Sequence, residues 1–271
     1  MRELTVVRPA PPTQPWVRPG RHELAYRAAL AALRAGLRIC TRTERVGLAN
    51  IPAEGPVIVV GNHISMADGV VLVTTVAKAG RLPRMMGTAG LFRARVLGWA
   101  LRHVGYIPVY RRSANPASAL GPAQDAIAAD QCIGLYPEGA ITRLPDHWPA
   151  RARTGVVRLA LDTGAPVVPV AQWGTQNLVG EEGTWHRVLL APFRRPRIEV
   201  AVGRPIDLRA ALALTTSAGA TAAQLRQGAD LVMDELCSLL EILTGQERPP
   251  HAGRVPNPLP ATDGPVERAA A

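Results

Sequence analysis

Short runs of Val, Ile and Leu alternate with longer segments of helical spacing along the middle of the chain. The runs 56–60, 132–136 and 166–173 have the composition of buried strands, and 84–87, 106–110 and 197–202 are further strand candidates. Helical spacing is found in 65–77, 91–104, 118–129, 154–163 and 221–243. This alternation predicts an α/β fold: a single domain with a central mixed, mostly parallel sheet that helices flank.

The two ends of the chain differ from its middle. Residues 1–20 are rich in proline and lack a period, which predicts an extended N-terminal arm. Residues 21–45 predict an amphipathic helix with arginines on its polar side, which either lies in a membrane interface or packs on its own domain. The main domain is expected at 46–245. Residues 246–271 hold six prolines and no apolar period, which predicts a disordered tail.

Composition excludes several classes of protein. Hydrophobic residues make up 47% of the chain, which is enough for a sizeable core and too many for general disorder. The 3 cysteines are far apart and odd in number, so a disulfide scaffold is excluded and a reducing compartment is expected. Because neither a signal peptide nor an apolar run of about 20 residues is evident, we expect a protein of the cytoplasm or of the membrane's cytoplasmic side.

The positive charge is concentrated in one part of the chain. The formal net charge is +10, and the window 69–124 contains no Asp or Glu. Its basic residues are Lys78, Arg81, Arg84, Arg93, Arg95, Arg102, Arg111 and Arg112. Such a window suggests an anionic partner, namely a phosphorylated substrate, an anionic membrane or a nucleic acid, although it could also be a solvated basic face. Aromatic residues are only 4% and no base-reading motif is present, which disfavours nucleic acid.

Candidate chemistry follows the ends of the predicted strands, where α/β proteins place their ligand sites. His63 follows the first strand, and Asp68 comes five residues later, at the start of a predicted helix. A carboxylate there can bind one imidazole nitrogen and leave the other free as a base. Ser65 is interpreted as a helix cap that forms a capping box with Asp68, because no G-x-S-x-G elbow supports a serine nucleophile.

Four motifs in order resemble those of the glycerolipid acyltransferases, in particular the PlsC-like bacterial 1-acylglycerol-3-phosphate (lysophosphatidate) acyltransferases. The resemblance covers roughly residues 45–205. The motifs are N-H-x4-D at 62–68, G-x-I-x-V-x-R at 105–111, an aromatic residue with P-E-G at 136–139, and an apolar strand with V-P-V at 168–170. In this chain the arginine of the third motif comes two positions later, at Arg143, in a loop that looks like that of actinobacterial members. Gly87 and Gly90 stand where many relatives have Lys and Glu.

The resemblance implies acyl transfer from acyl-coenzyme A or acyl carrier protein to the free sn-2 hydroxyl of lysophosphatidate. His63 would be the general base and Asp68 would orient it. Glu138 and Gly139 would bind the acceptor, with Glu138 accepting from a glycerol hydroxyl or bracing an arginine. The residues expected to bind the acceptor's phosphate are Arg111, Arg112 and Arg143.

No cofactor or metal is implied, and the expected place is the cytoplasmic face of the membrane, as a peripheral protein on an anionic surface. Acylation of glycerol-3-phosphate or of another lipid acceptor by the same residues is the first alternative. A basic nucleic-acid-binding protein and a His-Asp-assisted lipid hydrolase are the others.

Overall fold

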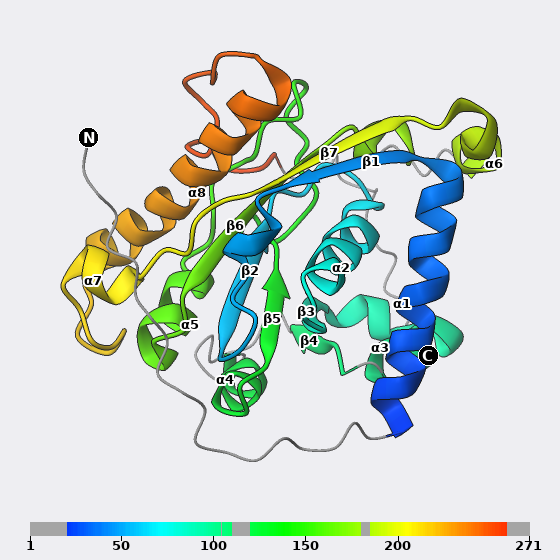
Figure 1. Cartoon of the computed structure of the whole chain (residues 1–271). Coiled ribbons are helices and arrows are strands. Elements are labelled where there is room, and N and C mark those ends of the chain that lie inside the picture. The colour runs from blue at the N-terminus through cyan, green and yellow to red at the C-terminus, as the bar shows by residue number, and fades with distance from the viewer. Residues whose placement is uncertain (1–20, 104, 110–119, 180–184, 259–271) are drawn as a thin grey trace, which may run out of the picture.

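The computed structural model describes residues 21–103, 105–109, 120–179 and 185–258. A sheet of 7 strands runs through the centre of this part (Figure 1). The strands are β1 (Arg42–Val46), β2 (Val57–Gly61), β3 (Pro83–Thr88), β4 (Ile107–Val109), β5 (Cys132–Leu135), β6 (Val167–Trp173) and β7 (Arg197–Val202).

The sheet is mixed and mostly parallel, as the sequence predicts. Its order is β1-β7-β6-β2-β5-β3-β4. From β6 to β4 all neighbours are parallel, whereas β7 is antiparallel to β6 and β1 is parallel to β7. The carboxyl ends of β6, β2, β5, β3 and β4 therefore lie at one edge of the sheet, which is also where β1 and β7 begin.

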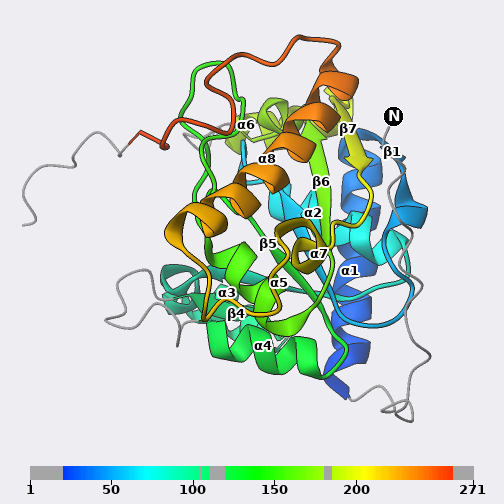
Figure 2. The same ribbon diagram turned by 90° about the vertical axis from the view of Figure 1, so that its left-hand side faces the viewer.

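Helices cover both faces of the sheet. They are α1 (Arg21–Cys40), α2 (Asp68–Lys78), α3 (Arg95–His103), α4 (Gly121–Ala128), α5 (Gly155–Thr163), α6 (Trp185–Arg194), α7 (Leu208–Leu212) and α8 (Ala222–Thr244). Figure 1 shows α1 and α2 on one side and α5, α7 and α8 on the other, and Figure 2 shows the second group in front of the sheet. The result is a three-layer α/β fold.

Strand β2 shows why the chain folds in this way. Its five residues are all buried, and alternate side chains enter different cores. Val57 and Val59 pack with residues of α1 and α2, whereas Ile58 and Val60 pack with residues of α5 and α8. A strand buried on both faces has no polar face, so it reads as an unbroken apolar run in the sequence.

Helix α1 packs on its own domain. Its buried residues Tyr26, Leu30 and Leu37 belong to the core on the α2 side. The helix ends at Cys40 rather than at residue 45, because the chain then enters β1, which pairs with β7. No apolar run marks β1, since alternate residues of this edge strand are exposed. None of the described helices combines the length and the hydropathy needed to cross a bilayer.

The single helix expected at 91–104 is two elements. A short 3-10 helix, η2 (Ala89–Arg93), is followed by α3, and the extended Ala94 separates them. The close approach of two backbone segments accounts for the break, because a Cβ on Gly98 would lie 2.2 Å from the carbonyl oxygen of Phe92. A glycine allows that contact, and apolar spacing alone does not reveal it.

The tail is ordered where the structure describes it, so the expectation of disorder from residue 246 is wrong for 246–258. Ala252 is fully buried and packs with Trp148, Cys237 and Leu240. Backbone N–H groups of Gly253 and Arg151 donate to the carbonyl oxygens of Pro149 and Val255 respectively. The sequence does not reveal this packing. The segment packs as irregular chain, so it has no helical or strand period, and its prolines resemble those of a disordered tail. Residues 1–20 and 259–271 lie outside the described part.

We predict that Ala252→Leu destabilises the protein. The added side chain has no space among Trp148, Cys237 and Leu240, and overpacking a core costs about 1–3 kcal/mol. The free energy of unfolding can be measured in urea. Glu247→Leu, at an exposed position of the same segment, is the matched control and should change it by less than about 0.5 kcal/mol. Equal stability of the two variants would mean that the segment does not pack as described.

Candidate active site

The candidate site lies at the carboxyl end of β2. Asn62 follows this strand and is fully buried. Its amide Nδ2 donates to the Gln172 carbonyl oxygen (2.9 Å), and its Oδ1 accepts from the Gln172 backbone N–H (2.7 Å). The side chain of Asn62 thereby continues the pairing of β2 with β6 by one step. This fixes the direction in which the chain leaves the sheet at His63.

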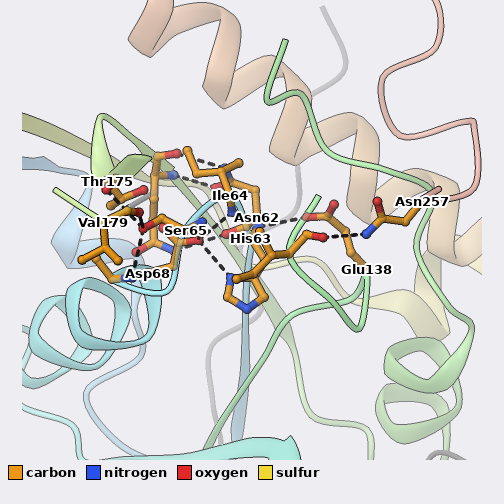
Figure 3. Close-up of polar contacts among 12 residues, drawn as sticks. Asn62, His63, Ile64, Ser65, Asp68, Glu138, Thr175, Val179 and Asn257 are labelled. Carbon is orange, nitrogen blue, oxygen red and sulfur yellow. Dashed lines mark hydrogen bonds and ion pairs between the residues drawn. The ribbon is translucent and has the colours of Figure 1, made fainter. Parts of the chain in front are cut away.

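His63 and Asp68 form the pair that the motif predicts (Figure 3). The imidazole Nδ1 lies 2.9 Å from Asp68 Oδ2, and the carboxylate is fully buried. An ionised carboxylate can only accept, so Nδ1 carries the proton and Nε2 is left as the basic nitrogen. The His63 side chain is 20% exposed, so the ring remains accessible to a small group from outside.

Backbone groups hold the Asp68 carboxylate in place. The N–H groups of Ile64 and Ser65 donate to Oδ2 over 2.6 and 2.7 Å. Asp68 is also the first residue of α2, where the helix dipole favours negative charge. The loop between His63 and Asp68 is therefore wrapped around a single oxygen atom.

Ser65 has a structural role that differs from the predicted capping box. Only half of the box forms, because Asp68 accepts from the Ser65 N–H while the Ser65 hydroxyl receives no bond from the Asp68 N–H. The hydroxyl instead lies against the carbonyl oxygens of Val179 (2.6 Å) and Thr175 (3.1 Å). It ties the loop to the segment after β6, where the 3-10 helix η4 (Thr175–Asn177) lies.

An aromatic ring supports the imidazole. Tyr136 stacks on His63 with ring centroids 4.1 Å apart and an interplanar angle of 15°. Gly61 provides the space, since a Cβ there would lie 3.0 Å from Tyr136 Cε1. Burial raises the pKa of Tyr136 well above its usual value, and the nearby charge of Asp68 adds to this. The tyrosine therefore stays neutral and presents a π face that favours an imidazolium.

Glu138 is turned inward, which corrects the expectation that it braces an arginine. Its Oε1 accepts from the His63 backbone N–H (2.9 Å), and its Oε2 accepts from the Ala150 N–H (2.8 Å). The side chain is almost fully buried. Glu138 thus joins three stretches of chain: the end of β2, the loop after β5 and the segment at residue 150. These partners could not be predicted from the sequence, because no residue pattern shows which backbone N–H groups will donate to a distant carboxylate.

The loop that follows Glu138 continues this attachment. Gly139 has φ +76°, a backbone conformation that favours glycine, and a Cβ there would lie 2.9 Å from Arg153 Nε. Two residues further on, Ile141 accepts from Asn257 Nδ2 (2.7 Å), and the Thr142 N–H donates to the His63 carbonyl oxygen (2.6 Å). His63 is therefore held from both its N–H and its carbonyl side.

The predicted arginines are distributed differently. The structure places Arg143 on the exposed side of the loop, where its N–H donates to Asn257 Oδ1 (2.9 Å) and its Nη1 to the Pro258 carbonyl oxygen (3.3 Å). Asn257 was missed altogether, because the contact spans more than a hundred residues. Arg111 and Arg112 lie outside the described residues.

Not all of the basic window faces a ligand. Arg81 is buried and donates to the carbonyl oxygens of Pro52, Gly55 and Asp130 over 2.7–3.2 Å. Two of these carbonyls precede β2, so Arg81 lies at the opposite edge of the sheet from His63. Arg81 therefore holds these loops together instead of being available to bind a ligand. The described residues contain no group of three or more His, Cys, Asp or Glu side chains with metal-binding proximity.

Comparison with known proteins agrees with this geometry. Residues 42–173 match the family model described as Acyltransferase. A chloroplastic 1-acyl-sn-glycerol-3-phosphate acyltransferase of Brassica napus is 29% identical over 52% of this chain and 41% of its own length. The 1-acyl-sn-glycerol-3-phosphate acyltransferase of Borreliella burgdorferi is 31% identical over 53% of this chain and 54% of its own. The chain thus matches about half, or less, of the length of these relatives.

A solved structure extends the likeness over most of the chain. The crystal structure of the 1-acyl-sn-glycerophosphate acyltransferase PlsC from Thermotoga maritima superposes with a TM-score of 0.60 and covers 83% of both chains at 22% identity. At this identity the likeness shows a common fold. With the motif residues assembled at the end of β2, and with the family model matched across the strands that carry them, residues 42–173 of this chain form a domain of the acyltransferase family.

Proposed function

We propose that this protein transfers a fatty acyl group from a thioester donor to the free sn-2 hydroxyl of lysophosphatidate, which gives phosphatidate. The observation that carries the proposal is the His63–Asp68 pair, with Nδ1 bound to the carboxylate and Nε2 left as the base at the carboxyl edge of the sheet. The named relatives, which are 1-acyl-sn-glycerol-3-phosphate acyltransferases, support the choice of acceptor.

The proposed reaction needs one proton acceptor and no covalent enzyme intermediate. His63 Nε2 takes the proton from the acceptor's hydroxyl as its oxygen forms a bond with the thioester carbonyl carbon. The carbon–sulfur bond then breaks, and the thiolate takes the proton from the imidazolium. The base is thereby regenerated, and the products are an ester and a free thiol. Asp68 stabilises the imidazolium by its charge, and the stacked Tyr136 does so by its π face.

The phosphate of the acceptor is assigned to arginines. A guanidinium group can bind phosphate through two parallel hydrogen bonds, which suits Arg111 of the second motif and Arg112 directly after it. Arg143 joins them in the proposal as an exposed residue of the loop beside the site. Glycerol-3-phosphate offers the same phosphate and a similar hydroxyl, so an acceptor panel distinguishes the two reactions by product mass.

In this proposal Glu138 and Gly139 affect acceptor binding indirectly, by fixing the backbone of the loop beside His63. Both Glu138 oxygens are engaged by N–H groups, so the residue shapes the loop around His63 instead of accepting from a glycerol hydroxyl. Burial raises the pKa of Glu138 to about 8, although the two N–H groups act in the opposite direction. The acyl donor is acyl-coenzyme A or acyl carrier protein, and the protein works as a peripheral protein on the anionic, cytoplasmic face of the membrane.

The first prediction concerns the base. We expect His63→Ala to lower kcat by about 10²–10⁴-fold or more, because general base catalysis is lost. His251→Ala is the control for the loss of a histidine from a second His–Asp pair, in which His251 Nε2 lies 2.8 Å from Asp146 Oδ2, and it should lower kcat far less. Turnover is measured as thiol release from acyl-coenzyme A, with circular dichroism to check the fold. A folded His63→Ala variant with normal turnover would exclude this residue as the base.

The second prediction concerns the phosphate. Arg111→Ala should raise KM for lysophosphatidate by about tenfold or more and affect kcat much less, because a charge-assisted bond to phosphate contributes mainly to binding. The control is the substrate: KM for monoacylglycerol, which has no phosphate, should be the same for both proteins. An unchanged KM for lysophosphatidate would assign the phosphate to another residue.

The third prediction concerns the pH dependence of stability. The raised pKa of Glu138 means that the folded state keeps a proton that the unfolded state releases near pH 4.5. This contribution is present at low pH and is lost as the pH rises toward about 8. Glu138→Gln removes the titration, so the variant should gain stability relative to the original protein between pH 5 and pH 8. Urea unfolding across this range measures the difference, and parallel curves for the two proteins would contradict the assignment.

A further inference from the structure

Helix α6 is apolar on the face that it turns to solvent. Leu189 is 77% exposed and Phe193 87%, and Leu190 beside them is also exposed. The opposite side of the helix packs on the domain, where Ala191 is buried. A surface helix of a globular protein normally has polar residues on its outer face, so this arrangement points to a missing apolar partner.

The last turn of α1 extends the apolar face. Ile39 is 60% exposed, and α6 lies beside this end of α1 in Figure 1. A hydrogen bond connects the two helices here: Arg195, which directly follows α6, donates from Nη2 to the carbonyl oxygen of Arg38 in α1 (3.1 Å). We call the exposed side chains of Ile39, Leu189, Leu190 and Phe193 the α6 surface.

Positive charge surrounds the α6 surface. The exposed arginines near it are Arg38, Arg187, Arg194 and Arg195. The sequence of α6 itself contains no Asp or Glu. Arg187 and Arg194, together with Asn177, line a pocket of about 300 Å³ at the edge of this surface. Apolar side chains with arginines around them match the chemistry of a bilayer whose headgroups are anionic.

The α6 surface lies at the edge of the sheet where His63 lies. Helix α6 connects the end of β6 to the start of β7, which is antiparallel to it, so the helix stays at the carboxyl edge of β6 and β2. The end of α1 lies there as well, because β1 begins at the same edge as β7. The Ser65 hydroxyl, which bonds to Val179, ties the catalytic loop to the segment that leads toward α6.

We infer that the α6 surface inserts into an anionic lipid bilayer and holds the carboxyl edge of the sheet against it. A lipid acceptor would then reach His63 from the membrane. The role of the surface in substrate delivery rests on the proposed function, but the insertion itself does not. The sequence left open whether the helix of 21–45 lies in a membrane interface or packs on its own domain, and the structure places only the last turn of α1 in this surface.

The experiment is co-sedimentation with vesicles in the absence of any substrate. The probes are vesicles of phosphatidylcholine alone and of phosphatidylcholine mixed with phosphatidylglycerol. We expect preferential binding to the mixed vesicles, which weakens as salt is added, because the arginines contribute through a screened attraction. Leu189→Ser/Phe193→Ser should weaken binding to them by about tenfold or more, since two exposed apolar side chains no longer enter the bilayer.

Leu24→Ser is the matched control. Leu24 is an exposed leucine (63%) at the opposite end of α1, away from the α6 surface, so its replacement should leave vesicle binding unchanged. Undiminished binding by Leu189→Ser/Phe193→Ser would overturn the inference. So would an equal loss in Leu24→Ser, because insertion would then involve all of α1. Sedimentation velocity tests for a second copy as the partner: a dimer that becomes monomeric in the double variant, with vesicle binding intact, would also overturn it.

A water-soluble, short-chain lysophosphatidate separates this inference from the proposed function. The double variant should acylate this acceptor like the original protein while failing to bind vesicles. If the original protein binds vesicles but acylates no lysophosphatidate, the proposed function fails and the α6 surface stands. Loss of activity on the soluble acceptor in the double variant would show that these side chains serve the site itself and would overturn the inference.

Discussion

Three N–H groups converge on a single carboxylate oxygen, Asp68 Oδ2, at the point where α2 begins. Two of them belong to the backbone of Ile64 and Ser65, and the third is the imidazole Nδ1–H. Since the carboxylate is buried, these donors replace the water that would otherwise bind its oxygen, and they in turn have it as their acceptor. The conformation of the loop 63–68, the start of α2 and the orientation of the His63 ring are therefore coupled through this oxygen, so a change in one of them disturbs the other two.

The rest of the site reinforces this arrangement from outside. Asn62 fixes the chain before His63 through Gln172 on β6, and Glu138 and Thr142 hold the backbone of His63 on either side. Tyr136 restricts the movement of the His63 imidazole by stacking on it. Each of these contacts joins segments that are far apart in the sequence. In the proposed reaction, a base held in this way loses little freedom when it accepts a proton, which is what positioning contributes to catalysis.

The fold was predictable from the sequence where burial leaves an unbroken apolar run. Strands β2, β5 and β6 are of this kind, and the His63–Asp68 pair was predictable because its two members are only five positions apart. Strand β1 was missed because exposed polar residues alternate along it. Helix α6 was missed because its large apolar side chains face solvent instead of the core. The partners of Glu138, like those of Asn257, depend on tertiary packing, so no local pattern could indicate them. The roles of Arg111 and Arg112 stay predictions.

The loop that carries Glu138 is fastened by a part of the chain that is synthesised more than a hundred residues later. Asn257 binds Ile141 and the N–H of Arg143, and the segment around Gly253 pairs with Pro149. A nascent chain in which β2 and β5 have already paired still lacks these contacts. The wall of the site beside His63 can thus take its final form only after residues 249–258 have left the ribosome. The order of synthesis itself therefore delays the proposed acyl transfer until these residues have emerged.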